Sequence, residues 1–382
     1  MSVNPPADPA SRHNPQRLLV TGGAGFIGAN FCHYWLQQYP DQPLIVLDAL
    51  RYAGNRHSLA DLDALAGFRF VQGDINDTDL VMALLREHAI DTLVHFAAES
   101  HVDRSIHDPD AFIRANILGT HSLLRAARAV WLDSPRGPAP HRFHHISTDE
   151  VYGTLGPADP PFTENTPYAP NSPYAASKAA ADHLVRSYQH TYGLRTSTSN
   201  CSNNYGPFHF PEKLIPLVIV NILHGRPLPI YGDGRQIRDW LYVEDHCRGI
   251  ERILRQGEEG ESYNIGGRNE WANIDIVQLI CQHMDAAFAQ NPGLAQRFPA
   301  AAPAQGQPSA SLIHHVQDRP GHDRRYAINA DKIARTLGFT PQTDFATGIA
   351  RTIRWYLDHP AWWQGVMDGS YQQWLDTQYG AG

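Results

Sequence analysis

The hydrophobic pattern of the chain becomes regular at residue 17, where short apolar runs begin to alternate with stretches of helical spacing. Four runs have the length and composition of buried strands: LLV, PLIVLDAL, FRFVQGDI and DTLVHFAAES. Stretches such as DTDLVMALLREHA and ANILGTHSLLRAARAV repeat apolar residues every three or four positions, which is typical of a helix with one buried face. HRFHHIST then resumes the strand pattern. Strands that alternate with helices predict right-handed βαβ units and a parallel sheet covered on both faces.

The pattern changes after residue 200. NCSNNYGPFHFPEKLIP is rich in Asn, Pro and aromatic residues, a composition that favours a loop over a binding cleft. IRDWLYVEDHCRGIERIL marks a return to regular structure, whereas residues 286–310 are rich in Ala, Pro and Gln. We predict that residues 286–310 form a mobile surface insertion without chemistry of its own.

Composition narrows the class of protein. The 382 residues include 42% apolar and 18% charged side chains, which is ordinary for a globular protein with a large core. A net charge of −8 gives no general argument for binding nucleic acid or an acidic membrane, and no apolar run approaches the length of a membrane span. The scattered cysteines favour reduced thiols in a cytoplasmic protein. The N-terminal segment lacks the apolar centre of a secretory signal, so we expect residues 1–16 to form a flexible tail.

Glycines at the spacing GxxGxxG join the first predicted strand to the first predicted helix: Gly22, Gly25 and Gly28. Such a turn lets the backbone approach a pyrophosphate, which then rests on the N-terminus of the helix. The glycines alone would equally fit a structural turn. Asp48, at the end of the second strand, adds a carboxylate that can bind an adenosine ribose and would repel a 2′-phosphate. The glycines and Asp48 together predict that the cofactor is NAD and not NADP. Arg51 could instead bind a 2′-phosphate, although an ordinary solvated loop arginine explains it equally simply.

The ends of the next two strands extend the predicted cofactor site. Asp74 ends the third strand, where it could contact an adenine or serve only as a loop residue. FAAES, residues 96–100, supplies small side chains along which a cofactor can lie. We therefore predict NAD contacts from Gly22, Gly25, Phe26, Ile27, Gly28, Asp48, Asp74, Ile75, Ala97, Ala98, Ser100, Tyr174 and Lys178.

These patterns predict an α/β protein with a Rossmann-type doubly wound parallel sheet and a smaller, mixed α/β C-terminal domain that binds the substrate. We assign the NAD-binding domain to residues 17–200 with 236–262. The substrate-binding domain then comprises residues 201–235 with 263–382.

Two further motifs indicate the chemistry. YAASK places Tyr174 and Lys178 one turn apart on a helix, where the ammonium and an oxidised nicotinamide would favour ionisation of the phenol. Downstream of a dinucleotide turn, this pair indicates hydride transfer on a secondary alcohol. STDEVYG puts Asp149 and Glu150 side by side at the end of a predicted strand. Either these acids lie on a solvated turn without a role, or the strand ends there and both face one pocket.

Several long segments resemble the nucleotide-sugar branch of the extended short-chain dehydrogenases, and more narrowly the dTDP-glucose 4,6-dehydratases. They are GGAGFIG, STDEVYG, YAASK, NNYGPFHFPEKLIP, RDWLYVEDH and DRPGHDRRYAI. The resemblance runs from residue 17 to WYLDHPAWW and YQQW near the C-terminus. Ala49 and Arg51 depart from the family pattern, as does the length of residues 286–310, and neither departure touches the catalytic motifs.

The resemblance implies an NAD-dependent dehydration of dTDP-glucose to dTDP-4-keto-6-deoxyglucose, as in the biosynthesis of rhamnose-type deoxysugars. It implies that Tyr174 is the base at O4, that Thr148 hydrogen-bonds O4, and that Lys178 holds the nicotinamide ribose and lowers the tyrosine pKa. Asp149 would be the acid at O6 and Glu150 the base at C5. Elimination needs an acid and a base close together, which favours a shared pocket for the pair.

The resemblance also implies contacts to the sugar and the nucleoside diphosphate. Cations such as Lys213 and Arg238 suit the phosphates, while Pro229 and Tyr231 could line a base pocket. No metal site is expected, because the histidines of HRFHHIS have no carboxylate partner at a suitable spacing. The predicted substrate residues are Ser100, Thr148, Asn203, Lys213, Leu214, Pro229, Tyr231, Arg238, Asn273 and Arg319.

Alternatives stay open at the level of sequence. A nucleotide-sugar 4-epimerase or decarboxylase would share the Tyr–Lys pair, but an epimerase has no elimination step and STDEVYG offers no cationic site for a carboxylate. A non-catalytic NAD-sensing protein could keep the glycine turn without needing the acids. Thymidine is favoured over uridine only by the overall resemblance, because one methyl group separates them. The family also implies a homodimer packed through the YAASK helix.

Overall fold

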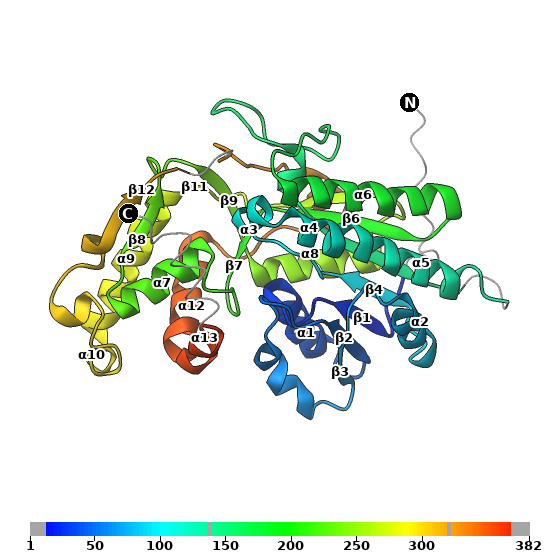
Figure 1. Cartoon of the computed structure of the whole chain (residues 1–382), viewed down its shortest axis with the longest axis horizontal. Helices are drawn as coiled ribbons and strands as arrows, with labels where there is room; N and C mark the ends of the chain where they lie inside the picture. Colours follow the sequence, from blue (N-terminus) through cyan, green and yellow to red (C-terminus); the bar gives the residue numbers. More distant parts are fainter. Residues whose placement is uncertain (1–12, 136–138, 319–321, 368–382) are drawn as a thin grey trace.

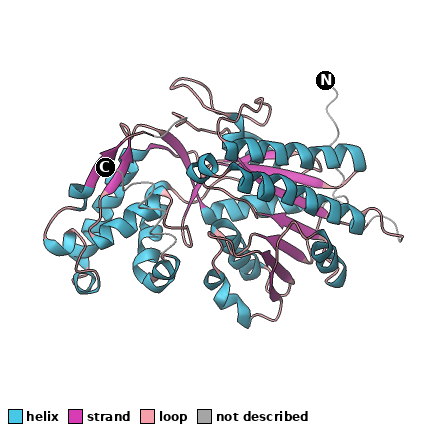
Figure 2. Ribbon diagram, in the orientation of Figure 1, coloured by secondary structure: helices cyan, strands magenta, loops and turns pink. Residues whose placement is uncertain are grey.

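The centre of the molecule is a seven-stranded parallel sheet; the computed structural model describes residues 13–135, 139–318 and 322–367 (Figures 1 and 2). The strand order is β10-β6-β5-β4-β1-β2-β3. Chain order reverses between β1 and β4, which creates the switch point where doubly wound sheets bind ligands. This sheet confirms the predicted Rossmann-type fold. The strands are β1 (Leu18–Thr21), β2 (Leu44–Asp48), β3 (Phe68–Gln72), β4 (Thr92–His95), β5 (Arg142–Thr148), β6 (Thr196–Cys201) and β10 (Ser262–Ile265).

Two layers of helices cover the sheet, because successive strand side chains point to opposite faces. Leu18 and Val20 belong to one buried layer, while Leu19 and Leu93 belong to the other. The first layer contains α1 (Phe26–Gln38), the 3₁₀ segment η2 (Arg56–Ala64), α8 (Val243–Gln256) and α11 (Asp331–Leu337). The second contains α2 (Thr78–Glu87), α5 (Gly119–Trp131) and α6 (Pro173–Tyr192).

A smaller unit with its own hydrophobic core lies beside the sheet, coloured green to red on the left of Figure 1. Its helices are α7 (Leu214–His224), α9 (Asn273–Gln290), α10 (Gly293–Arg297), α12 (Phe345–Asp358) and α13 (Pro360–Val366). Its strands are β7 (Asn203–Tyr205), β8 (Leu228–Tyr231), β9 (Ile237–Tyr242), β11 (Glu270–Ala272) and β12 (Ile313–Val316). None of the helices in the described ranges is long and apolar enough to cross a membrane.

Short helical elements complete the two units. They are α3 (Val102–His107), α4 (Pro109–Phe112), the π-helical turn η3 (Ile113–Leu118), and the 3₁₀ turns η4 (Asp149–Tyr152), η5 (Pro303–Gln305) and η6 (Ser309–Leu312). Strand β9 pairs with β7 and β11, although residues 236–262 were predicted to belong with the large sheet. Conversely, β10 pairs with β6, and α11 buries Ile333 and Leu337 in the core of the large unit. Strand pairing and helix packing set these boundaries, and local composition does not reveal them.

Residues 286–310 are not the loose insertion that their composition suggests. Leu294, Phe298 and Ala301 are at most 7% exposed and join the hydrophobic core of the smaller unit. Ser309 Oγ donates a hydrogen bond to Asp285 Oδ1 at 2.6 Å. The prediction of a mobile insertion was therefore wrong, because a few well-spaced apolar side chains anchor a segment that is otherwise rich in Ala, Pro and Gln.

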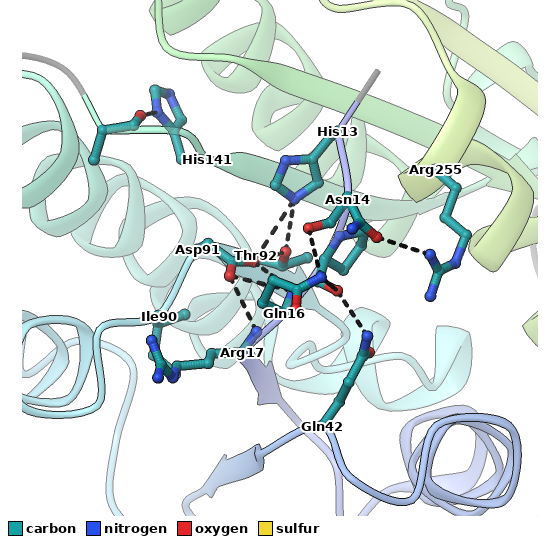
Figure 3. A network of polar contacts seen from close by, with 12 residues as sticks. His13, Asn14, Gln16, Arg17, Gln42, Ile90, Asp91, Thr92, His141 and Arg255 are labelled. Carbon is teal, nitrogen blue, oxygen red and sulfur yellow. Dashed lines mark hydrogen bonds and ion pairs between the residues drawn. The ribbon is translucent and has the colours of Figure 1, made fainter. Parts of the chain in front are cut away.

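The segment before β1 is also held in place, although residues 13–16 were predicted to be part of a flexible tail (Figure 3). The backbone N–H groups of Gln16 and Arg17 each donate to the Asp91 carboxylate at 3.1 Å. His13 Nε2 lies 2.7 Å from Thr92 Oγ1. These contacts gather at the N-terminal ends of β1 and β4. Residues 13–16 therefore form part of the fold, at the sheet edge opposite the C-terminal strand ends.

Candidate active site

The glycine turn between β1 and α1 is closed so tightly that side chains would not fit. Gly22 has φ +71°, and a Cβ atom there would lie 2.5 Å from the backbone nitrogen of Ala97. A Cβ on Gly28 would lie 2.3 Å from the carbonyl oxygen of Gly22. Gly25 is the N-cap of α1, so the free N–H groups of that helix begin at the turn. The geometry suits a bound pyrophosphate.

Asp48 closes the neighbouring turn and lines the same cavity. Its Oδ2 accepts a hydrogen bond from Ala24 N at 2.9 Å, and its Oδ1 accepts one from Leu50 N at 2.8 Å. Burial raises the pKa of this carboxyl, and the two backbone donors oppose that rise. Because each carboxylate oxygen can accept more than one hydrogen bond, the group could still bind a ribose.

Arg51, the residue that could have indicated a phosphorylated ribose, is paired with Asp74. Its Nη2 lies 2.8 Å from Asp74 Oδ2, and both side chains are about two-fifths exposed. Asp74 Oδ1 also accepts a hydrogen bond from Asn76 N at 2.9 Å. The charge of Arg51 is therefore already balanced by a carboxylate at this edge of the cavity.

The acidic pair follows directly from the end of β5, since Thr148 is the last strand residue and η4 begins at Asp149. Thr148 caps the turn: its Oγ1 accepts a hydrogen bond from Glu150 N at 3.3 Å. Both acids line the cavity, so the strand does end here and the pair does not lie on a solvated turn. Asp149 is only 2% exposed, and its Oδ2 has no hydrogen-bond partner among the described residues.

Asp149 is the more deeply buried of the two acids, and its surroundings favour its protonated form. Burial, then the charge of Glu150 and then that of Asp239 raise the pKa of Asp149 well above its ordinary value. Asp149 is therefore protonated at a pH where an exposed aspartate would be charged. A buried carboxylic acid of this kind can donate a proton to a leaving group.

Tyr174 and Lys178 lie on α6, whose first turn is capped by Ser172 Oγ accepting from Ala175 N at 3.1 Å. Lys178 Nζ donates to the carbonyl oxygen of Ile146 at 2.7 Å, and burial lowers the pKa of this lysine to about 8. Burial and then the charge of Glu150 raise the pKa of Tyr174, while a hydrogen bond with Thr148 opposes the rise.

The expected lowering of the Tyr174 pKa by Lys178 is thus not a property of the protein alone. The neighbouring carboxyls and the buried position outweigh it, so the phenol holds its proton in the ligand-free protein. The positive ring of an oxidised nicotinamide is the additional charge that would favour the phenolate.

Asn116 supports the site without lining the cavity, and the sequence analysis did not single it out. It lies in the π-helical turn η3, a kind of irregularity that often marks functional sites. Its side chain accepts from Glu99 N at 2.8 Å, donates to Glu99 O at 2.9 Å, and donates to Ser177 Oγ at 2.8 Å. It therefore fixes the loop after β4 against α6. A buried Asn within an otherwise helical stretch was the only available signal.

Residues 206–213 cover the cofactor end of the cavity, as predicted for a loop over the cleft. His209 stacks on Phe26 at the start of α1, with ring centroids 4.1 Å apart. Tyr52 OH donates to Glu212 Oε1 at 2.8 Å, and Lys213 Nζ donates to the carbonyl oxygen of Ser100 at 3.0 Å. The loop is thus bonded to the large unit at several points.

One cavity of about 450 Å³ joins these features. It is lined by Gly22, Gly25, Phe26, Ile27, Gly28, Asp48, Asp74, Ile75, Ala97, Ala98, Ser100, Thr148, Asp149, Glu150, Tyr174, Lys178, Asn203, Lys213, Leu214, Pro229, Tyr231, Arg238 and Asn273. The structure therefore brings together every predicted site residue except Arg319, which lies outside the described residues. Lining residues that the sequence analysis did not assign include Tyr52, Glu99, Trp240, His322 and Tyr326.

The substrate end of the cavity contains polar groups without partners. Asn203 Oδ1, Asn273 Oδ1 and Trp240 Nε1 are buried and have no hydrogen-bond partner among the described residues. Unsatisfied buried groups are rare, so a polar ligand is the natural partner here. Arg238 is 6% exposed, donates from Nη2 to Asp323 O at 2.9 Å and lies over the Tyr326 ring.

The doubly wound sheet, the glycine turn and the Tyr–Lys pair define an extended short-chain dehydrogenase/reductase. Residues 19–352 match the family model described as GDP-mannose 4,6 dehydratase. The chain is 55% identical over 356 residues to a dTDP-glucose 4,6-dehydratase of Xanthomonas campestris, covering 93% of this chain and 97% of that protein. It is 50% identical to dTDP-glucose 4,6-dehydratase 1 of Escherichia coli K12, covering 95% and 99%. The chain belongs to the dTDP-glucose 4,6-dehydratase family.

Solved structures agree with this placement. DesIV, a dTDP-glucose 4,6-dehydratase from Streptomyces venezuelae crystallised with NAD bound, matches with a TM-score of 0.79 and 45% identity, over 92% of this chain and 99% of that one. A UDP-glucose 4-epimerase from Thermotoga maritima matches with a TM-score of 0.74 and 23% identity, covering 90% of this chain and 99% of that one. The epimerase shares the fold alone.

Proposed function

We propose that this chain removes water from dTDP-glucose to give dTDP-4-keto-6-deoxyglucose, with NAD as its cofactor. The observation that carries the proposal is the shared cavity of Asp149, Glu150 and Tyr174, because elimination needs an acid and a base beside an alcohol oxidation site. Membership of the dTDP-glucose 4,6-dehydratase family supports the choice of substrate. An epimerase has no use for the acidic pair.

The cofactor would lie along the C-terminal ends of the strands. The turn at Gly22–Gly28 would hold the pyrophosphate, Asp48 the adenosine ribose, and Lys178 the nicotinamide ribose. Bound NAD would supply the capacity to accept a hydride from C4 of the sugar and to return it to C6. The loop of residues 206–213 would exclude water from this end of the cavity.

Tyr174 would accept the proton from the O4 hydroxyl as the alcohol becomes a ketone. Thr148, which shares a hydrogen bond with Tyr174, would orient O4 between the two side chains. Lys178 would favour this transfer through its charge. Because the pKa of Tyr174 is raised in the ligand-free protein, the phenol would give up its own proton, and so become able to accept the one from O4, only when cofactor and substrate are in place.

The ketone at C4 makes the C5 proton acidic, and Glu150 would accept that proton. Asp149, which holds a proton at its buried carboxyl, would donate it to the O6 hydroxyl so that water leaves C6. After hydride returns to C6, Glu150 would give its proton back to C5. The overall reaction releases one water and leaves the cofactor in its starting redox state.

Residues of the smaller unit would bind the nucleoside diphosphate. Arg238 and Lys213 would contact the phosphates, and Asn203 and Asn273 have unpartnered oxygens that could accept hydrogen bonds from sugar hydroxyls. The base would lie near Leu214, Pro229 and Tyr231, which line the far end of the cavity. A preference for a thymidine nucleotide over a uridine nucleotide is also part of the proposal.

A substrate panel tests the reaction. Incubation with dTDP-glucose should give a product lighter by one water, with slower or absent turnover of UDP-glucose and GDP-mannose. Loss of carbon dioxide from a UDP-glucuronate, or an isomer of unchanged mass, would instead indicate a decarboxylase or an epimerase. Normal NAD binding without turnover of any nucleotide hexose would indicate a sensing protein.

The remaining parts of the proposal concern assembly and context. We infer a homodimer packed through α6, supported by exposed apolar side chains on α6 and on the neighbouring η3: Ile113, Leu118 and Tyr192 are each at least 43% exposed. Light scattering on the eluting protein should give twice the monomer mass. We also propose a cytoplasmic enzyme of deoxysugar biosynthesis of the rhamnose type, which a gene deletion and sugar analysis would test.

A further inference from the structure

We propose that Asp182 is a positioning residue of this enzyme, which ties the catalytic helix α6 to the end of β5 and balances the charge of Lys178. Asp182 lies one helical turn after Lys178 and is 6% exposed. Its Oδ2 accepts hydrogen bonds from Ser147 Oγ at 2.7 Å and from Tyr168 OH at 2.9 Å. Its Oδ1 lies 3.1 Å from His145 Nε2.

These contacts connect the two elements that carry the chemistry. Ser147 directly precedes the residues Thr148, Asp149 and Glu150, whereas Asp182 shares α6 with Tyr174 and Lys178. The Lys178 ammonium donates to the carbonyl of Ile146, and Asp182 accepts from Ser147 and lies against His145, the residues on either side of Ile146 in β5. The strand end is therefore fixed to the helix over consecutive residues, which sets the placement of the acids against the phenol.

Charge makes Asp182 more than a structural link. Burial lowers the pKa of Lys178 to about 8, and the charge of Asp182 is the first influence that opposes this fall. Burial raises the pKa of Asp182 to about 6, and the charge of Lys178 opposes that rise. Between these values Lys178 and Asp182 are both ionised, so each keeps the other charged in a buried place.

Other titratable groups around the pair do not replace this charge. Burial, followed by the charge of Lys178, holds the pKa of His145 well below its ordinary value, so His145 is neutral near neutral pH. Burial and then His145 act in the same way on His95. The titratable groups that face the pair are His183 on α6, His145 on β5, His95 on β4, Cys201 on β6, Tyr152 in η4, and Tyr168 before α6.

The consequence is a defined pH response. Without the Asp182 charge, the pKa of Lys178 falls further below about 8, and the ammonium is lost at a lower pH. In the proposed reaction Lys178 must be charged, so the alkaline limb of the kcat profile should move to lower pH. This kinetic part of the inference rests on the proposed function.

The composition of the chain allows a direct test, because it contains only three lysines: Lys178, Lys213 and Lys332. Carbon-13 labelling of the lysine side chains and an NMR titration of the NAD-bound protein would follow each ammonium separately. In Asp182→Asn, the pKa of Lys178 should fall by about one unit, while Lys213 and Lys332 serve as internal references and stay unchanged. This readout does not depend on turnover, so it separates failure of the inference from failure of the proposed function.

Kinetics should then follow the titration. Asp182→Asn should lose about tenfold in kcat at alkaline pH and much less at mildly acidic pH, with little change in KM. Asp182→Glu, which keeps the charge, should restore the alkaline limb. Arg186→Gln removes an exposed charge one turn further along α6 and should leave both readouts unchanged.

Ser147→Ala provides a second variant in case Asp182→Asn does not fold. It cuts one hydrogen bond between β5 and α6 but leaves the carboxylate in place, so kcat should fall severalfold without a shift of the Lys178 titration. An unchanged Lys178 pKa and an unchanged alkaline limb in folded Asp182→Asn, or a full wild-type kcat in Ser147→Ala, would overturn the inference.

Discussion

At the scale of single residues, two adjacent acids gain different properties from one turn of chain. The end of β5 at Thr148 lets the side chains of Asp149 and Glu150 reach the same cavity, although neighbours within a strand would point apart. Asp149 is 2% exposed and Glu150 is half-buried, and burial followed by the charge of Glu150 raises the pKa of Asp149 well above its ordinary value. The adjacent acids predicted an unequally shared proton, and the family resemblance implied Asp149 as the acid. The sequence could not show that burial and the charge of the distant Asp239 add to the rise of its pKa.

Exchange of the C5 proton with solvent distinguishes the proposed roles of Asp149 and Glu150. In heavy water, Asp149→Asn should still oxidise C4 and exchange the C5 proton, so recovered dTDP-glucose should carry deuterium at C5. Glu150→Gln should show no such exchange. Both should lower kcat by about a hundredfold or more, which is the usual effect of losing a general acid or base.

Tyr174→Phe is the matched control for these variants, because it blocks the reaction before the ketone forms. Absorbance of the reduced nicotinamide should build up on Glu150→Gln and stay absent in Tyr174→Phe. Deuterium at C5 in substrate recovered from Glu150→Gln would assign the base to another group.

The raised pKa of Asp149 also predicts an effect on stability. The pKa of Asp149 in the folded protein lies above its value of about 4 in the unfolded chain, so between these two pKa values the folded protein binds one more proton than the unfolded chain. The free energy of unfolding therefore falls as the pH rises from the unfolded-state pKa to the folded-state pKa. Asp149→Asn avoids charging the buried site. Its Tm should therefore exceed that of the wild type by about 2–4 °C at alkaline pH and by less at about pH 5. Calorimetry at both pH values measures this; a constant difference would exclude the linkage.

At the scale of elements, the glycine turn and the first helix were predictable because their geometry is local. The glycine spacing, together with Asp48 at the end of the second strand, predicted the tight turn at Gly22 and Gly28, and the alternation of strands and helices predicted the parallel sheet. Residues 286–310 were misjudged since Leu294 and Phe298 reveal their role only when the opposing helices are present. The role of Asn116 was not predicted for the same reason, because its hydrogen-bond partners Glu99 and Ser177 are remote in sequence.

Gly28→Ala should force the glycine turn open, so that it no longer holds the pyrophosphate of NAD closely. The new Cβ would lie 2.3 Å from the carbonyl oxygen of Gly22, a backbone atom that cannot move aside without opening the turn. NAD affinity measured by calorimetry should fall by about tenfold or more. Gly365→Ala is the control, because open space surrounds that helical glycine and Ala favours a helix. Equal NAD affinity in the two variants would contradict the role of the turn.

At the scale of the whole molecule, the two units share one cavity and are joined across its mouth. Glu212 in the covering loop accepts from Tyr52 of the large unit, and its other oxygen lies 3.4 Å from Arg104 Nε. The guanidinium of Arg104 in turn lies over the Tyr52 ring at 3.8 Å. The sequence predicted a loop over a cleft, but it could not show which residues fasten the loop, because they come from three separate segments.

Tyr52→Phe tests whether the hydrogen bond between Tyr52 and Glu212 holds the covering loop closed. It removes the hydrogen bond to Glu212 and keeps the ring under Arg104, so the fold should persist while the loop opens more often. Release of NAD should become about three- to tenfold faster, as expected for the loss of one hydrogen bond to a buried carboxylate. Stopped-flow displacement of bound NAD measures the rate. An unchanged release rate would show that the loop is held by other contacts.

The attachment of residues 13–16 to Asp91 has a practical consequence for handling the enzyme. The chain enters the sheet at the N-terminal ends of β1 and β4, where contacts to Asp91 and Thr92 hold it (Figure 3). A linker fused ahead of His13 would therefore leave from the side opposite the C-terminal strand ends that line the cleft. Beads, sensor chips or a scaffold protein coupled through that linker would present the open side of the cleft to the solution. A fusion that replaced residues 13–16 would instead remove the side-chain contacts of His13 with Thr92 and of Asn14 with Arg255, which help to hold this segment on the fold.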